Sequence, residues 1–106
     1  MLRVLLVAST ILVSSTAVLA QGSVEHGREL AVKHCARCHD ISPNGKFKTY
    51  PPSFASIAVF RAQDQIMGRI KLPALHSRMP QMDWILSLEG VDNLVAYIMS
   101  LEKPLE

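Results

Sequence analysis

One five-residue run, Cys35-Ala36-Arg37-Cys38-His39, contains both cysteines of this 106-residue chain. In a helical turn, residues three and four positions apart project to nearly the same side, so two thiols and an imidazole would face one ligand. Cys-x-x-Cys-His is the signature of covalent haem attachment. We therefore predict one covalently bound haem c per chain. Cys35 and Cys38 would bind its edge, and His39 would be an axial ligand of its iron.

Paired cysteines have other uses. A redox-active Cys-x-x-Cys belongs to a βαβ pattern, which this sequence does not show. Structural zinc needs four ligands; His34, His39 and His76 could contribute, but there is no second paired-ligand motif. A disulfide is the ordinary expectation for an exported chain with two cysteines, but the two-residue separation followed at once by His39 argues against it.

The first twenty residues differ from the rest of the chain. Arg3 precedes a largely apolar run at 4–13, and Val18 and Ala20 lie where a signal peptidase reads the chain. The run is short for a transmembrane helix, which needs about 20 residues. We expect a signal peptide at residues 1–20 and one domain at 21–106, located in the periplasm. An uncleaved N-terminal anchor is the alternative.

The remaining residues carry helical signals and no convincing period-two run, so the predicted class is all-α. A domain as small as residues 21–106 usually needs a disulfide, a metal or a large buried ligand to be stable, and haem would be that part of its core. Serines precede three of the four expected helices as N-caps. The first helix is expected at about 24–37, and the second follows Ser53 and contains Phe54, Ile57 and Ala58. The third begins at Gln63 or Asp64, has Ile66, Met67 and Ile70 on one face, and is closed by Pro73. The fourth follows Ser87, has Val91, Leu94, Val95, Ile98 and Leu101 at helical spacing, and ends at Pro104.

The second axial ligand decides whether the iron only transfers electrons or also binds external ligands. Met67 and Met99 fall at helical spacing within apolar faces, which favours core packing. Met79 and Met82 lie in the irregular stretch 74–84, where a loop could bring a thioether to the iron. His76 is a rival, because ligation by two histidines would lower the reduction potential.

Three segments together resemble the small bacterial class I cytochromes c. They are Gly27-Arg28-Glu29-Leu30-Ala31 before the attachment motif, His76-Ser77-Arg78-Met79-Pro80, and Leu94-Val95-Ala96-Tyr97-Ile98-Met99-Ser100-Leu101. The resemblance implies a cytochrome c-like fold, with three to five helices around one haem and crossing first and last helices.

The same resemblance implies roles for single residues. Met79 would be the distal iron ligand, with Met82 as runner-up. Gly27 would be the small residue at the helix crossing, where Tyr97 packs. The carbonyl of Pro51 or Pro52 would bond the proximal imidazole, with the register between the two open.

Trp84 follows the methionine ligand instead of preceding it, so the family's propionate-binding tryptophan role is not transferred, and core packing is expected. The haem pocket is expected to be mostly apolar, and its candidate walls are Phe54, Ile57, Leu72 and Leu75.

The function predicted from these residues is a periplasmic one-electron carrier with His39 and Met79 as axial ligands. Its partners would be redox proteins, with the chain a monomer or a subunit of a redox complex. A net charge of +2 without a block of like charge gives no sign of nucleic-acid binding. The sequence shows no nucleophile–base pair and no pair of carboxylates, so we expect neither an enzyme nor a small-molecule substrate. The alternatives are an accessory haem subunit of a periplasmic dehydrogenase and a ligand-binding haem sensor.

Overall fold

The computed structural model describes residues 22–75 and 78–103, so the expected signal peptide, His76 and Pro104 lie outside the described residues. The elements in this part are α1 (Val24–His34), α2 (Phe54–Phe60), α3 (Gln63–Lys71), the 3-10 turn η1 (Met82–Trp84) and α4 (Leu88–Met99). In the described ranges the only extended pairing is an isolated bridge between Thr49 and Pro52. The all-α prediction is confirmed. None of the helices described is both long and apolar enough to span a membrane.

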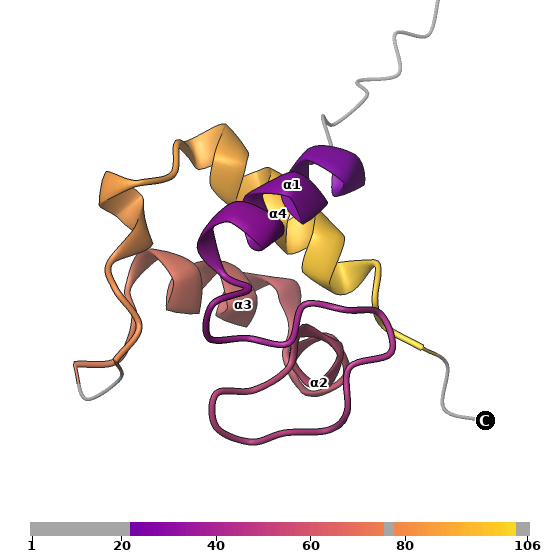
Figure 1. Ribbon diagram of the computed structural model, residues 1–106. Coiled ribbons are helices and arrows are strands. Elements are labelled where there is room, and N and C mark those ends of the chain that lie inside the picture. Colours follow the sequence, from indigo (N-terminus) through magenta and orange to yellow (C-terminus); the bar gives the residue numbers. More distant parts are fainter. Residues whose placement is uncertain (1–21, 76–77, 104–106) are drawn as a thin grey trace, which may run out of the picture.

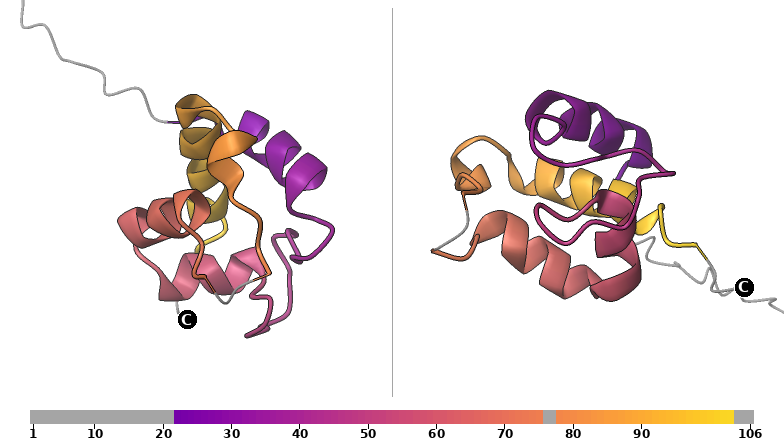
Figure 2. Two further views of the ribbon diagram at one scale, coloured as in Figure 1. Left: turned by 90° about the vertical axis from the view of Figure 1, so that its left-hand side faces the viewer. Right: turned by 60° about the horizontal axis from the view of Figure 1, so that its bottom comes forward.

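Helix α4 is the centre of the fold, because it packs against α1, α2 and α3. Figure 1 shows α1 crossing α4, and both views in Figure 2 place α4 between α1 and the α2–α3 pair. The buried apolar side chains form one cluster around α4: Ala31, Cys35, Phe54, Ala58, Ile66, Ile70, Met82, Leu86, Val91, Leu94, Val95, Tyr97, Ile98 and Leu101. Every predicted helix therefore contributes to a single core.

The crossing of α1 and α4 depends on the absence of a side chain at Gly27. A Cβ atom there would collide with the Asn93 carbonyl oxygen and lie 2.8 Å from the Tyr97 Cβ. Beside it, the backbone N–H of Ser23 donates to Asn93 Oδ1 at 2.7 Å, which gives a buried amide a partner. The expected meeting of Gly27 and Tyr97 at the crossing is confirmed.

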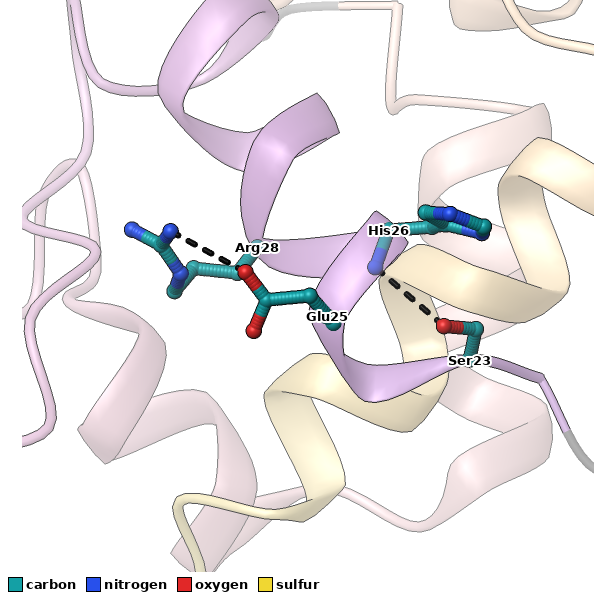
Figure 3. Close-up of polar contacts among 4 residues, drawn as sticks. All are labelled: Ser23, Glu25, His26 and Arg28. Carbon is teal, nitrogen blue, oxygen red and sulfur yellow. Dashed lines mark hydrogen bonds and ion pairs between the residues drawn. The ribbon is translucent and has the colours of Figure 1, made fainter.

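Serine side chains cap the three helices as predicted. The hydroxyl oxygens of Ser23, Ser53 and Ser87 each accept a backbone N–H in the first turn of the following helix. Figure 3 shows the first of these, in which His26 N–H donates to Ser23 Oγ at 3.2 Å. Such caps satisfy N–H groups that have no partner within the helix. The same view shows Glu25, whose charge suits the helix dipole, paired with Arg28 at 3.2 Å.

The prediction of core packing for Trp84 is wrong, because its side chain is 85% exposed. In η1, Met82 points into the core and is only 3% exposed. A 3-10 helix turns about 120° per residue, so a side chain two positions further faces away from Met82. The indole N–H of Trp84 instead donates to Gln81 Oε1 at the surface.

Candidate haem-attachment site

The attachment motif forms a tight turn at the carboxyl end of α1. Cys35 caps the helix, and its carbonyl accepts the N–H groups of Cys38 at 3.1 Å and His39 at 2.9 Å. The helix therefore ends at His34 and does not reach residue 37 as predicted. The reason lies in the last turn, where the N–H of Ala36 bonds to the Ala31 carbonyl five residues back and ends the regular ladder.

The two cysteines have different surroundings within this turn. Cys35 is buried and Cys38 is exposed, and both thiols are free. Burial raises the pKa of Cys35 to about 11, and the neighbouring Cys38 adds to the effect. A buried thiolate is costly because it loses its hydration. One of the two thiols that would hold the haem thus lies at the core boundary and the other at the surface.

His39 is oriented by the loop that follows it. Its Nδ1 atom lies 2.7 Å from the Pro52 carbonyl oxygen. Since a carbonyl can only accept, Nδ1 carries the proton, and Nε2 of the neutral ring has a free lone pair for a metal. The half-buried imidazole also lies against Phe54, with the ring centroids 5.5 Å apart. The structure thus resolves the register left open between the two prolines in favour of Pro52.

The loop from Asp40 to Ser53 is held at its ends. The Phe54 N–H donates to the Asp40 carbonyl at 2.9 Å, which closes the loop onto the start of α2. The Tyr97 hydroxyl donates to the Ile41 carbonyl at 2.6 Å and so ties the loop to α4. Burial raises the pKa of Tyr97, so the phenol keeps its proton for this bond. The position of Pro52 opposite His39 is therefore supported from two helices.

Two hydrogen bonds, from Tyr97 to Ile41 and from Ser23 to Asn93, are not predicted from the sequence. Each joins a side chain on α4 to a backbone group more than fifty positions away in the chain. Short-range spacing cannot report such a pair. For Tyr97, the resemblance predicts packing at the helix crossing and does not predict the bond of its hydroxyl group.

The two candidate thioethers lie in different environments. Met82 is part of the buried core, whereas Met79 is half-buried at its border. Met67 and Met99 pack partly buried against the core, as expected from their helical spacing. His76, the rival ligand, lies outside the described residues. The structure thus leaves Met79 as the more accessible methionine of the stretch before α4.

The four residues expected to form the walls of the haem pocket differ in burial. Phe54 is buried and Ile57 is half-buried, whereas Leu72 and Leu75 are exposed. Phe54 contacts both His39 and Tyr97, with a centroid distance of 6.3 Å to the tyrosine ring. The proximal wall next to His39 is therefore built, and the role of Leu72 and Leu75 stays a prediction.

The alternative uses of the cysteines find no support in residues 22–75 and 78–103. The strand that a redox-active βαβ motif needs is missing there, since the secondary structure before Cys35 is a helix. In the same ranges no three His, Cys, Asp or Glu side chains group together as a metal site.

The donor set fits haem c. Two free thiols and an imidazole with an available Nε2 occur in one turn, which is what covalent attachment and axial ligation require. The comparison with solved structures found no match. The family model "Cytochrome c" matches residues 24–102, which covers all the helices described and the attachment motif. The chain belongs to the cytochrome c family, and its cofactor is haem c, covalently bound through Cys35 and Cys38.

Proposed function

We propose that this cytochrome c is a periplasmic electron carrier with one haem, held between His39 and Met79. Membership of the family implies electron transfer with redox partner proteins. The observation that carries the finer proposal is the bond from His39 Nδ1–H to the Pro52 carbonyl, which leaves Nε2 free for iron. When bound, haem c supplies a one-electron couple between ferric and ferrous iron.

The chain's own residues tune that couple. The Pro52 carbonyl holds the imidazole of His39 in one orientation and increases its basicity as a ligand. The thioether of Met79 is a soft, neutral donor that favours reduced iron. The half-buried position of Met79, compared with the burial of Met82 in the core, supports Met79 as the ligand. Two strong ligands would leave no open position for a substrate, so the proposed protein is a carrier without catalytic activity.

The attachment residues are tested by exchanging both thiols. We expect the Cys35→Ser, Cys38→Ser double variant to lose haem on denaturation, whereas the wild-type chain retains it. A pyridine haemochrome spectrum of the unfolded chain measures this directly. Covalently retained haem in the double variant would refute the assignment.

The distal ligand is tested in the ferric protein. A weak absorbance band near 695 nm is expected from the resemblance to class I cytochromes. It should disappear in Met79→Ala and persist in Met82→Ala. The reverse result would assign the ligand to Met82. Persistence of the band in the Met79→Ala, Met82→Ala double variant would refute ligation by either methionine.

Export is proposed from the sequence of residues 1–20, with cleavage after Ala20. Amino-terminal sequencing of protein expressed with its export and haem-maturation machinery should begin at Gln21. A chain that begins at Met1 and partitions with membranes would support the anchored alternative instead.

A second candidate is an accessory haem subunit bound permanently to a dehydrogenase. The observation that favours it is a pair of exposed aromatic side chains, Phe47 and Phe60, which pack on each other at the surface. Exposed apolar groups that gather at one place often mark a protein interface. A permanent subunit should copurify in a fixed ratio with its enzyme, whereas a diffusible carrier should purify alone.

A further inference from the structure

The exposed aromatic pair is a built feature of the surface. Phe47 is 67% exposed and Phe60 is 64% exposed, yet their rings meet edge to face with centroids 5.4 Å apart. Phe47 comes from the loop after the haem motif and Phe60 is the last residue of α2. Large aromatic side chains are normally buried, and those that stay exposed together are enriched at binding surfaces.

The backbone holds this pair in place. The N–H of Lys48 donates to the buried Ser56 Oγ at 3.3 Å, and Ser56 Oγ is also 2.7 Å from Ser53 Oγ. Ser56 lies one helical turn before Phe60, so the bond fastens the loop against the same face of α2. The two rings are thus presented by fixed segments, which lowers the entropy that a partner's binding would cost.

The pair is distinct from the haem site. The aromatic residue that contacts His39 is Phe54, at the first turn of α2. Phe60 follows six residues later, about 9 Å along the helix axis, and points toward the loop. A partner resting on Phe47 and Phe60 would therefore lie beside the haem without needing to displace its proximal wall.

A basic groove adjoins the aromatic pair. Arg61 follows Phe60 directly and lines, with Gln65, Gly68 and Arg69, a groove of about 290 Å³. Its fifth lining residue, Leu72, is also a predicted wall of the haem pocket, so the groove borders that pocket. In the described part of the chain the only ion pair joins Arg28 and Glu25, so neither guanidinium of the groove is neutralised there.

The surrounding segment has the same sign of charge. Residues 41–75 contain the cations Lys46, Lys48, Arg61, Arg69 and Lys71, and the single carboxylate Asp64. Asp64 does not line the groove. Guanidinium groups bind carboxylates in a bidentate geometry, so the groove suits an acidic side chain.

We propose that Phe47, Phe60 and the groove between Arg61 and Arg69 form the docking surface for an acidic protein partner. This inference rests on the proposed electron-carrier function, because it identifies the kind of redox protein that the carrier meets. An apolar side chain of the partner would lie on the two rings, and a neighbouring aspartate or glutamate would enter the groove. Aromatic and arginine side chains are the residues that most often dominate protein–protein binding energy. A concave groove fits a single carboxylate better than a flat membrane surface.

The test uses the reduced, ¹⁵N-labelled holoprotein and a synthetic peptide in which Asp and Glu alternate with Phe and Leu. Backbone amide shifts during titration should concentrate at residues 46–50 and 60–69. The Arg61→Glu, Arg69→Glu double variant and Phe47→Ser should each weaken binding by about tenfold. Added salt should weaken the charged contribution.

Matched controls lie on α1, which α4 separates from the α2–α3 pair (Figure 2). Lys33→Glu reverses an exposed charge and Val32→Ser removes an exposed apolar side chain, and both should bind the peptide like the wild-type protein. Shifts centred on α1, or unchanged binding in the groove and aromatic variants, would overturn the proposal. The proposal would also be overturned, in favour of a membrane, by a second result. In it, the wild-type protein does not bind the peptide but binds phosphatidylglycerol vesicles, and this binding is lost when Arg61 and Arg69 are replaced by glutamate.

The same samples separate this inference from the proposed function. Reduction of the haem by dithionite and its reoxidation by ferricyanide, followed in the visible spectrum, test the electron carrier and need no partner. A protein that cycles normally but fails to bind the peptide refutes only the docking surface. A protein that binds the peptide at the predicted residues but cannot be reversibly reduced refutes the carrier function and leaves the surface standing.

Discussion

Replacing Gly27 with alanine should destabilise the domain, although alanine is the better helix former. The added methyl would lie 2.6 Å from the Asn93 carbonyl carbon and 2.8 Å from the Tyr97 Cβ. Backbone atoms cannot rotate away as a flexible side chain can. Helices α1 and α4 would have to separate, and the bond from the Ser23 N–H to Asn93 Oδ1 would lengthen or break.

The magnitude follows from three contributions to the free energy of unfolding. Alanine gains about 1 kcal/mol of helix propensity over glycine. Overpacking in a close contact costs about 1–3 kcal/mol. Leaving the buried Asn93 amide without its partner costs a further ~1–3 kcal/mol. The net loss is about 3 kcal/mol. In a domain of this size, that lowers the melting temperature by roughly 12 °C or more.

Thermal and urea unfolding of the holoprotein, followed by circular dichroism at 222 nm, measures this loss. Gly68→Ala is the matched control, because nothing lies within 4 Å of a Cβ atom at that position in α3. The same substitution there should stabilise the protein by up to about 1 kcal/mol. If Gly27→Ala is as stable as the wild-type protein, or if both variants lose stability equally, the explanation by a steric clash is refuted.

Three smaller effects follow from the same contacts and are measured by urea unfolding. Tyr97→Phe should cost about 1 kcal/mol, because it removes the donor to the Ile41 carbonyl; no loss would show that water replaces the bond. Trp84→Ala should change stability by less than about 0.5 kcal/mol, since the side chain is exposed; a larger loss would contradict its surface position. Ser87→Ala should cost about 1 kcal/mol by removing the acceptor for the Gly90 N–H, and a glycine at the same position should restore most of it.

Local chemistry explains which parts of the fold could be predicted from sequence. Capping by Ser23, Ser53 and Ser87 depends on residues within one turn, so the starts of three helices were correctly placed. The resemblance to the class I cytochromes c predicted that Gly27 and Tyr97 meet at the helix crossing, and α4 supplies that contact at Asn93 and Tyr97. The caps needed only short-range geometry, whereas the crossing, which joins distant parts of the chain, was predicted from the resemblance.

The errors arose where no period constrains the chain. Between α3 and α4 the sequence has no helical repeat, so the inward direction of Met82 and the outward direction of Trp84 could not be predicted. The end of α1 was misplaced for a related reason. The motif's spacing suits a helical turn, but the turn is built on the Cys35 carbonyl after the regular helix has ended.

Tyr97 connects the helix crossing to the haem site. Its Cβ lies at the Gly27 contact, its ring contacts Phe54, and its hydroxyl holds the Ile41 carbonyl in the loop that carries Pro52. Phe54 in turn lies against His39. A displacement of α1 from α4 should therefore alter the orientation of the imidazole, although no ligand is changed. We expect Gly27→Ala to shift the reduction potential of the haem as well as the stability, whereas Gly68→Ala should shift neither potential nor spectrum. A potential unchanged in a destabilised Gly27→Ala protein would show that the loop holds His39 independently of the crossing.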